Sequence, residues 1–340
     1  MRQIKASAVA ILCVTSVALG CASPEQPSPA PVVHWVSPAD SARWTQSQHE
    51  GSERLAAHQN GEAERAFTDA LDAVRAGGPR DPRASVSVDW LLRVGRAYEE
   101  SGHWVDLERV SRLVLDTEVV RSSTDARVRL LARKSLVNSL TQQRRFDEAL
   151  AEAAEGYEDA AQHHAPDSPI VLDWVSVEAS VSMAAGRFAD AEIGLRRVLE
   201  QQIDATGSDT PSVGAALNEL AWCLLHQGRF SDAEPFAQRS VAAFAKMSPE
   251  PRELGASLDT LAEVEQKLGR RDEAERGYRH AIVILRRFRP ETDSLLVSVL
   301  DHLVALLRGS GRTKDADAVN KELLAIRSDI ANRSQPNQTQ

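Results

Sequence analysis

The octapeptide Gln227-Gly228-Arg229-Phe230-Ser231-Asp232-Ala233-Glu234 has related copies along the chain, spaced by 41 or 42 residues. The copies begin at Gly102-His103-Trp104, Arg144-Arg145-Phe146, Gly186-Arg187-Phe188, Gly269-Arg270-Arg271 and Gly311-Arg312-Thr313. A weaker copy starts at Gly61-Glu62. A register kept through seven units predicts a repeat protein, in which each unit is one supersecondary element that must stack on its neighbours to bury its apolar face.

Each unit has the pattern of two helices joined by a tight turn. The segment before Gly228 carries Leu217, Leu220, Ala221 and Leu224 at the i, i+3, i+4, i+7 spacing of one helix face. The glycine can adopt the left-handed conformation that ends a helix. The aromatic residue two positions later is expected to pack into the turn. One unit therefore predicts a helical hairpin.

Two features of the second helix lead to specific expectations. Ser231 and Glu234 have the spacing of a capping box, which predicts that this helix starts at Ser231. A small residue recurs further on, where the two helices should cross most closely and a larger side chain would push them apart. These residues are Ala149, Ala191, Ala233, Ala274 and Ala316.

The pattern resembles the tetratricopeptide repeat (TPR). Leu91, Val94, Gly95 and Tyr98 fit the first half of the family's motif, and the second half is matched by Ala274, Tyr278 and Ala281. The usual unit has 34 residues, so each helix here should be about one turn longer. The 42-residue length and the segment Leu217–Ala221 are similar to the kinesin-light-chain subtype. The resemblance covers residues 83–331 well and 40–82 weakly, and Arg144 departs from it by replacing a glycine.

The resemblance implies an all-α fold, a right-handed α-solenoid of about seven repeats over residues 39–332. The repeats are expected near 39–80, 81–121, 122–164, 165–206, 207–247, 248–289 and 290–332. The first helices are expected near 39–60, 83–101, 123–143, 169–185, 211–227, 250–268 and 291–309. The second helices are expected near 62–76, 104–120, 146–163, 188–205, 230–247, 271–288 and 314–332. The last helix should cap the open end, and 333–340 should form a disordered polar tail.

The first twenty residues have the pattern of an export signal rather than of a membrane-spanning helix. A short basic start is followed by an apolar run from Ala6 to Leu19, which as a helix would extend about 21 Å, less than the roughly 30 Å of a bilayer core. Ala18-Leu19-Gly20-Cys21 resembles the lipobox of bacterial lipoproteins, which implies a lipid on Cys21. An ordinary signal peptide with an accidental cysteine is the alternative. Residues 21–38 include a Pro/Ser-rich stretch suited to a stiff tether.

The net charge limits the kinds of partner that the protein can bind, and the cysteine content limits its possible disulfide bonds. The net charge is −9, and it becomes −11 without residues 1–20, because these carry Arg2 and Lys5 and no acid. Such an acidic chain lacks the basic footprint that nucleic-acid binding requires, so no nucleic-acid partner is expected. If Cys13 leaves with the signal and Cys21 carries the lipid, only Cys223 remains, which excludes an intramolecular disulfide framework.

The sequence carries no pattern of a known catalytic site, so we expect no enzyme, no cofactor and no metal. Phosphate-cradling glycine loops, paired-histidine metal helices, nucleophile elbows and Cys-x-x-Cys pairs are all missing. His163 and His164 are adjacent on a helix and do not face one another, which favours solvated side chains over a metal site. Cys223, with His226 three residues later, is expected to be a small buried hydrophobic residue rather than a nucleophile.

A binding surface is implied by the TPR resemblance. In that family, ligands contact first-helix positions about ten and six residues before the turn residue. Those positions hold Leu92 and Arg96, Lys134 and Asn138, Ser176 and Ser180, Asn218 and Trp222, Asp259 and Glu263, and Asp301 and Ala305. The first half is basic and the second half is acidic, which would suit a partner segment of opposite polarity. Trp222 is either an anchor for the partner or a residue that packs on the adjacent repeat.

Known ligand preferences of the family do not transfer simply. Lys134 and Asn138 resemble the start of a clamp that holds a chaperone's terminal carboxylate, but Val177, Ala215 and Glu219 replace its later members. Kinesin light chains keep an asparagine at the first of the two positions, and only Asn218 retains it. We therefore expect the partner-binding residues to be Arg96, Lys134, Asn138, Asn218, Trp222, Asp259 and Glu263.

These expectations define a non-enzymatic lipoprotein adaptor in the bacterial periplasm that binds an extended segment of another envelope protein or peptide. Ala22 follows Cys21, which favours the outer membrane if the organism sorts lipoproteins as enteric bacteria do. A pilotin-like structural assembly factor for an outer-membrane machine is the alternative, and an accessory subunit of an envelope enzyme is a third. The oligomeric state and the partner's identity are not fixed by the sequence.

Overall fold

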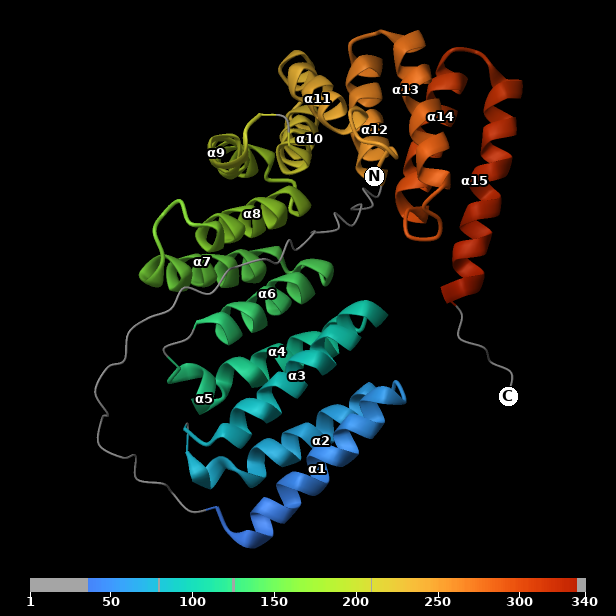
Figure 1. The fold of residues 1–340 in the computed structure, drawn as a ribbon. Coiled ribbons are helices and arrows are strands. Elements are labelled where there is room, and N and C mark those ends of the chain that lie inside the picture. Colours follow the sequence, from blue (N-terminus) through green and yellow to red (C-terminus); the bar gives the residue numbers. More distant parts are fainter. Residues whose placement is uncertain (1–35, 79, 124–125, 209, 335–340) are drawn as a thin grey trace. The chain divides into compact units, whose positions relative to one another are not determined.

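The computed structural model describes residues 36–78, 80–123, 126–208 and 210–334 (Figure 1). The signal peptide, Cys21 and most of the tether therefore lie outside the described residues, as do 335–340. Every regular element among the described residues is a helix. None of the described helices is long and apolar enough to cross a membrane. The described residues fall into two compact units, 36–185 and 186–334, called the N-terminal and C-terminal units below.

Consecutive helices form the repeat hairpins within each unit. In the N-terminal unit the helices are α1 (Pro38–Ala56), α2 (Asn60–Ala73), α3 (Pro82–Ser101), α4 (Trp104–Asp116), α5 (Glu118–Arg121), α6 (Arg127–Gln142), α7 (Phe146–His163) and α8 (Pro169–Ala184), with a short 3-10 turn η1 (Arg75–Gly77). In the C-terminal unit they are α9 (Phe188–Thr206), α10 (Pro211–His226), α11 (Phe230–Ala245), α12 (Arg252–Lys267), α13 (Arg271–Arg286), α14 (Asp293–Gly309) and α15 (Thr313–Ser334).

The predicted turns are confirmed at six of the seven copies. Gly102, Gly186, Gly228, Gly269 and Gly311 all have positive φ, between 72° and 85°. Arg144 holds the same place with φ of 63°, so a side chain is tolerated in the left-handed conformation there. The turn thus keeps its position in the repeat even where the residue is not glycine, which is usually preferred in this conformation.

The first repeat is out of register with the prediction. Its turn residue is His58, with φ of 58°, and Gly61 lies inside α2. The first helix consequently ends at Ala56 rather than near residue 60. Elsewhere in this repeat, Gly51 of α1 packs closely on α2, since an added Cβ there would lie 2.6 Å from Phe67.

The capping-box prediction is wrong. α11 begins at Phe230, its N-cap residue is Arg229, and no side chain caps the helix. Ser231 is already the second helical residue, so its backbone no longer has the extended conformation that an N-cap residue needs. Side-chain caps occur instead at the first helices, where Ser168 and Thr210 accept hydrogen bonds from the amides of Val171 and Val213.

Three boundaries also differ from the prediction. The helix expected over 104–120 is divided into α4 and α5, because Thr117 has an extended backbone with ψ of 138°. α6 begins at Arg127 rather than near residue 123. α15 continues to Ser334, so the first two residues of the expected tail are helical.

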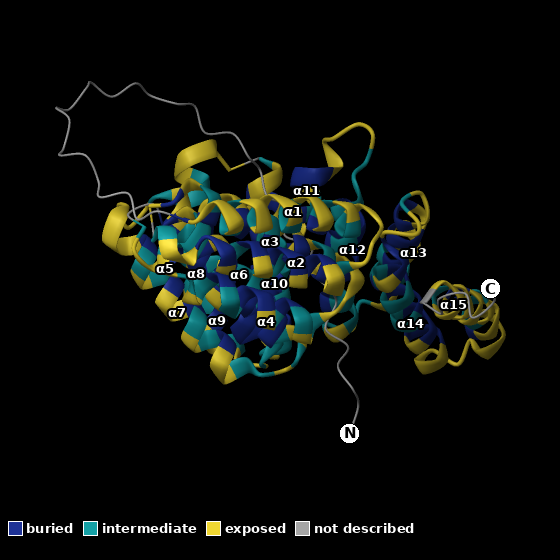
Figure 2. Ribbon diagram, turned by 90° about the horizontal axis from the view of Figure 1, so that it is seen from below, coloured by how far each residue is buried: buried dark blue, intermediate teal, exposed yellow. Residues whose placement is uncertain are grey.

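The cores of both units lie between neighbouring hairpins. Most helices have a buried side and a more exposed side (Figure 2). The largest cluster in the C-terminal unit joins α11 to α15 around Leu258, Tyr278, Leu300 and Leu307. In the N-terminal unit Trp174 of α8 packs on Gly156 of α7 so closely that an added Cβ would lie 2.3 Å from the indole ring. Among the described side chains of α15, Ala316, Leu323 and Ile326 alone are buried, as expected of a terminal helix.

The predicted crossing alanines are confirmed as core residues: Ala149, Ala191, Ala233, Ala274 and Ala316 are all fully buried. Replacing Ala233 with leucine inserts three carbons into this packing and should lower the free energy of unfolding by about 1–3 kcal/mol. The matched control is Ala242→Leu on the exposed side of the same helix, where a change within about 0.5 kcal/mol is expected. Urea denaturation measures both, and equal effects of the two substitutions would contradict the crossing role.

Candidate functional site

The candidate site is the side of the first helices that carries the residues ten and six positions before each turn. We call it the first-helix face, and it is described for each unit by itself. The helices that contribute to it are α3, α6 and α8 in the N-terminal unit and α10, α12 and α14 in the C-terminal unit. Their register is set by the turn residue that ends each helix and, for α8 and α10, by a Ser or Thr N-cap followed by proline at the first helical position.

In the N-terminal unit, two of the predicted binding residues pair with neighbouring helices. The Lys134 ammonium donates to both carboxylate oxygens of Asp173 on α8, at 2.9 and 2.8 Å. The side-chain amide of Asn138 donates to Glu99 on α3, at 2.6 Å. A partner would therefore have to compete with contacts that these side chains already make.

Arg96 differs from these two residues because it is exposed and has no polar partner among the described residues. Leu92 on the same helix is partly buried in the core. Ser176 donates to the carbonyl of Leu172 in its own helix. Arg96 is therefore the group of this face with most capacity for a new contact.

The C-terminal unit has a partly buried ion pair on its first-helix face. Asp259 of α12, 9% exposed, accepts from Nδ1 of His302 on α14 at 2.9 Å. Burial by itself lowers the pKa of His302, but the hydrogen bond to Asp259 and the nearby carboxylates of Glu263 and Asp301 raise it to about 9. His302 is thus protonated at neutral pH. The ring of Tyr278 lies 5.7 Å from the imidazole and packs against this pair.

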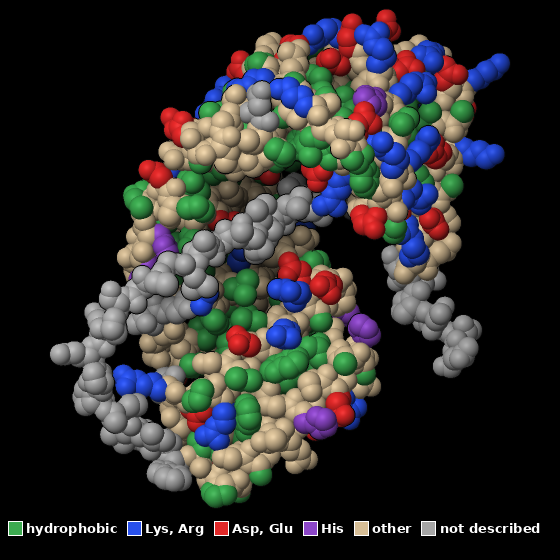
Figure 3. All heavy atoms as spheres, viewed as in Figure 1, with side chains coloured by type: hydrophobic (Ala, Val, Ile, Leu, Met, Phe, Trp, Pro, Cys, Tyr) green, Lys and Arg blue, Asp and Glu red, His purple; other side chains and the backbone are tan. Residues whose placement is uncertain are grey.

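The two remaining acids of this face differ in their contacts. Asp301 of α14 is held by Arg327 of α15 at 2.5 Å. Glu263 of α12 has no hydrogen bond or ion pair within the described part of the chain. Acidic and basic side chains are interspersed over the region of α12–α15 (Figure 3), so most charges there are compensated locally and Glu263 is an exception.

Trp222 packs within an aromatic cluster of its own unit. Its ring lies against that of His226, with centroids 3.9 Å apart and the planes tilted by 34°, and Phe188 of α9 meets it edge-on at 5.7 Å. His226 also contacts Phe188, at 5.2 Å. The packing alternative for Trp222 is therefore realised, although its side chain stays partly exposed.

The side chains of Asn218 and Glu219 of α10 have no hydrogen-bond donor or ion-pair partner among the described residues. The side-chain oxygen of Asn218 is buried and accepts no hydrogen bond from any described residue. Glu219 likewise has no hydrogen bond or ion pair there, and burial raises the pKa of its carboxyl to about 7. Two acceptors thus lie next to each other on this helix without donors.

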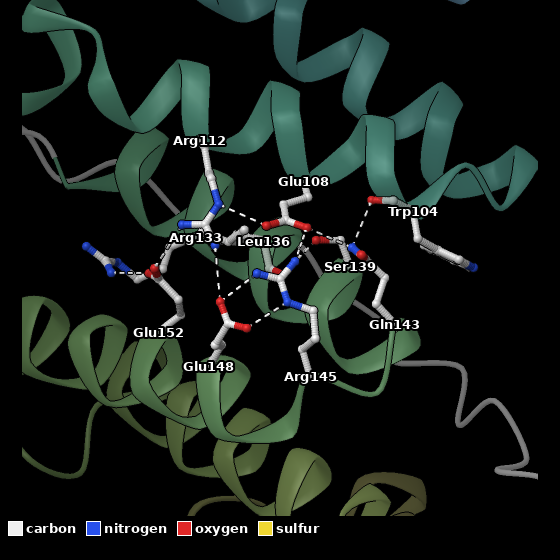
Figure 4. A network of polar contacts seen from close by, with 10 residues as sticks. All are labelled: Trp104, Glu108, Arg112, Arg133, Leu136, Ser139, Gln143, Arg145, Glu148 and Glu152. Atoms are coloured by element: carbon white, nitrogen blue, oxygen red, sulfur yellow. Dashed lines mark hydrogen bonds and ion pairs between the residues drawn. The ribbon is translucent and has the colours of Figure 1, made fainter.

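Arg145, which directly follows the turn residue Arg144, has a structural role that was not predicted from the sequence. In Figure 4, Arg145 lies between Glu108 of α4 and Glu148 of α7, and donates to them at 2.5 and 2.6–2.7 Å. Gln143 and Arg112 also donate to Glu108. Burial opposes ionisation of Glu108, but these three donors outweigh it and hold its pKa below the usual range. The arginine therefore ties one hairpin to the preceding one.

The same link recurs in the C-terminal unit, between an arginine after the turn and a glutamate 36 or 37 residues earlier. Arg229 contacts Glu192 at 2.6 Å, Arg270 contacts Glu234 at 2.7 Å, and Arg312 contacts Glu275 at 2.6 Å. The nearly constant offset within the repeat was visible in the sequence and could have identified the pair. These residues stabilise the stacking and do not belong to the first-helix face.

The residues considered for catalysis have the expected environments. Cys223 is fully buried, its thiol donates to the carbonyl of Phe188 at 3.0 Å, and burial raises its pKa, so the reactive thiolate is disfavoured. His226 bonds the carbonyl of Trp222 instead of the thiol. His163 and His164 are exposed, and the described residues hold no cluster suited to a metal ion.

Comparison with known proteins agrees with this architecture. Residues 178–246 match the family model described as tetratricopeptide repeat. Over these residues the chain is similar to tetratricopeptide repeats. No curated protein sequence matches the chain.

Solved structures of repeat proteins share the fold. A kinesin light chain with nearly identical TPR-like repeats from Podospora anserina has 21% sequence identity and a TM-score of 0.51, and the match covers 62% of this chain and 100% of that one. BtubC (BKLC) from P. vanneervenii has 16% identity and a TM-score of 0.54, with 75% and 94% covered. Aspartyl phosphate phosphatase F from Bacillus subtilis has 11% identity and a TM-score of 0.58, with 85% and 71% covered. At these identities the likeness shows the fold alone.

The pair of Asp259 and His302 predicts a pH dependence of stability. His302 has a raised pKa in the folded state, so its contribution to stability is fully present below its unfolded value of about 6.5 and is lost as the pH rises through about 9. We expect the free energy of unfolding of the His302→Gln variant to fall less than that of the unmodified protein between pH 6 and pH 10. Urea denaturation across this range tests it, with His280→Gln on the exposed surface as control. Parallel pH profiles for the unmodified and His302→Gln proteins would refute the assignment.

Proposed function

We propose that this chain is a non-enzymatic lipoprotein adaptor of the bacterial cell envelope, which binds an extended segment of another envelope protein along its first-helix face. The tetratricopeptide fold supports protein binding, and the 42-residue unit supports the kinesin-light-chain-like subtype. Lipid attachment at Cys21 and a location at the outer membrane are supported by the residues Ala18 to Ala22. No nucleic acid, metal or cofactor enters this proposal.

The observation that carries the binding site is the presence of polar groups on the first-helix face that lack partners among the described residues. Arg96 is such a group in the N-terminal unit, and Asn218 and Glu263 are such groups in the C-terminal unit. Lys134, Asn138 and Asp259 would bind by exchanging their present contacts, and Trp222 would contribute the exposed part of its ring. Groups that gain a hydrogen bond without losing one favour binding most.

The alternative is a pilotin-like assembly factor that uses the opposite surface. Second helices expose several large apolar side chains, among them Val105 on α4, Ile193 on α9 and Val283 on α13, at 66%, 75% and 56% exposure. Such residues would suit a partner that covers the second helices. They are single side chains on separate helices, which favours the first-helix face as the main site.

A photo-crosslinking amino acid distinguishes the two surfaces. Placed at Glu263 on the first-helix face, it should capture a partner in intact cells, whereas the same group at Ile193 should not. Mass spectrometry of the crosslinked product identifies both the partner and its contacting segment. Capture at position 193 alone would favour the assembly factor, and capture at neither position would refute both surfaces.

Lipid attachment is tested separately from partner binding. Growth with a labelled palmitate should label the unmodified protein, and the Cys21→Ala variant should incorporate none and lose its membrane association. Cys223→Ala is the matched control, because its thiol is buried, and it should be labelled like the unmodified protein. Equal labelling of the Cys21→Ala variant would show that the lipobox assignment is wrong.

A further inference from the structure

Three apolar side chains form a row across the first-helix face of the N-terminal unit. Leu92 of α3 is partly buried, whereas Leu131 of α6 and Ile170 of α8 are 48% and 39% exposed. The three residues are spaced by 39 positions along the chain. A row that crosses three consecutive first helices offers a partner more apolar surface than a single scattered side chain does.

The contact of Lys134 with Asp173 fixes the positions of Leu131 and Ile170. These two charged residues are also 39 positions apart, and the ammonium lies 2.8 Å from the carboxylate. Leu131 lies one helical turn before Lys134 on the same side of α6. Ile170 lies one turn before Asp173 on the same side of α8. The two apolar side chains are therefore neighbours on adjacent helices.

The contact of Asn138 with Glu99 connects α3 to α6 in the same way. This pair again spans 39 positions, with 2.6 Å between the amide nitrogen and the carboxylate oxygen. Leu92 and Leu131 each lie two turns before a member of the pair, so they occupy adjacent positions on the two helices. The members of the row are thus about 8–10 Å apart, which is the usual distance between the axes of packed helices.

Two charged side chains of opposite sign lie on either side of the row on α3. Asp89 precedes Leu92 by three residues and Arg96 follows it by four, so all three share one side of the helix. Asp89 and Arg96 are exposed, and neither has a hydrogen bond or ion pair with any described residue. A partner residue that packs on Leu92 would therefore be best placed between a basic neighbour, which reaches Asp89, and an acidic neighbour, which reaches Arg96.

We propose that Leu92, Leu131 and Ile170 form a subsite for a polyproline II segment of the bound partner. Such a helix has three residues per turn and rises about 3.1 Å per residue, so every third side chain lies on one side at a spacing of about 9 Å. This spacing matches the row, whereas an extended strand places its same-side residues about 7 Å apart. The preferred segment has an apolar residue at every third position, and one of these stands between a basic and an acidic residue. The proposal rests on partner binding at the first-helix face.

A polyproline II segment suits this surface for two further reasons. A proline-rich segment is already extended when it is free, so it loses little conformational entropy on binding. The ion pair of Lys134 with Asp173 beside the row can also stay intact, because contacts with Leu131 and Ile170 do not replace it. Binding therefore gains apolar burial without the loss of an existing polar contact.

The test measures the binding of two labelled peptides to the full-length protein by fluorescence anisotropy. The first, fluorescein-Pro-Lys-Leu-Glu-Pro-Leu-Pro-Pro-Leu-Pro-amide, has leucine at every third position. The second, fluorescein-Pro-Lys-Leu-Glu-Leu-Pro-Leu-Pro-Pro-Pro-amide, has the same composition with its leucines at alternate positions. The first peptide should bind about tenfold more tightly, because only its leucines match the spacing of the row.

Substitutions in the protein test each part of the subsite. Leu131→Ser and Ile170→Ser each remove one apolar contact from an exposed position and should weaken binding of the first peptide by about five- to tenfold. Val105→Ser, at an exposed valine of the second helix α4, is the matched control and should bind like the unmodified protein. Arg96→Gln should weaken binding of the first peptide, and should leave binding unchanged when glutamine replaces the glutamate of that peptide.

Equal binding of the two peptides, or unchanged affinity of both the Leu131→Ser and Ile170→Ser variants, would overturn the subsite. Stronger peptide binding after deletion of residues 22–31 would overturn an external partner as the occupant, because it would show that this Pro/Ser-rich segment of the chain itself competes for the row. Continued partner crosslinking at Glu263 in the first case would leave the adaptor function standing, so the failure of the subsite and the failure of the adaptor function are distinguishable.

Discussion

The close crossing of two helices within each hairpin is the constraint on which the other features depend. Ala233 and Ala274, both fully buried, keep the second helix close enough to its partner for the leucines of the first helix to pack in the core. Gly277 shows how tight this approach is, since a Cβ added there would lie 2.9 Å from Ala262. A hairpin closed in this way still exposes apolar surface on its sides, and stacking of hairpins buries it. The first-helix face exists because that stacking uses the other sides of the helices.

Polar contacts fix the position of each hairpin relative to the preceding one, which apolar burial alone leaves loosely specified. Arg145, Arg229 and Arg312 each follow a turn and reach a glutamate of the preceding hairpin, 37 residues earlier. The planar guanidinium donates in two directions at once, to that glutamate and to an acid three residues ahead in its own helix. One side chain therefore ties the start of a helix to the neighbouring repeat. A lysine could not hold both contacts in a fixed geometry, which explains the choice of arginine.

The periodic features of the chain were predictable, and the individual contacts were not. Helix identity, the turns from Gly102 onward and the crossing alanines follow from local periodicity and from the size of one side chain. The first repeat was missed because His58 adopts the left-handed conformation without being glycine. The positions of the first-helix face were given by the family pattern, yet the pairing of Lys134 with Asp173 depends on which residue of the next helix faces it. Which residue faces Lys134 depends on how neighbouring helices are rotated about their axes, and this rotation cannot be read from the local sequence of one helix.

Some polar side chains of the first-helix face already have hydrogen-bond or ion-pair partners and others do not, and this difference determines what the face can bind. A partner that engages Lys134 or Asp259 replaces an existing contact, so the net gain is small. A partner that reaches Arg96, Glu263 or Asn218 forms contacts where the free protein has none among its described residues, and its gain is correspondingly larger. Selectivity should therefore reside in a few unsatisfied groups rather than in the whole row of first-helix residues.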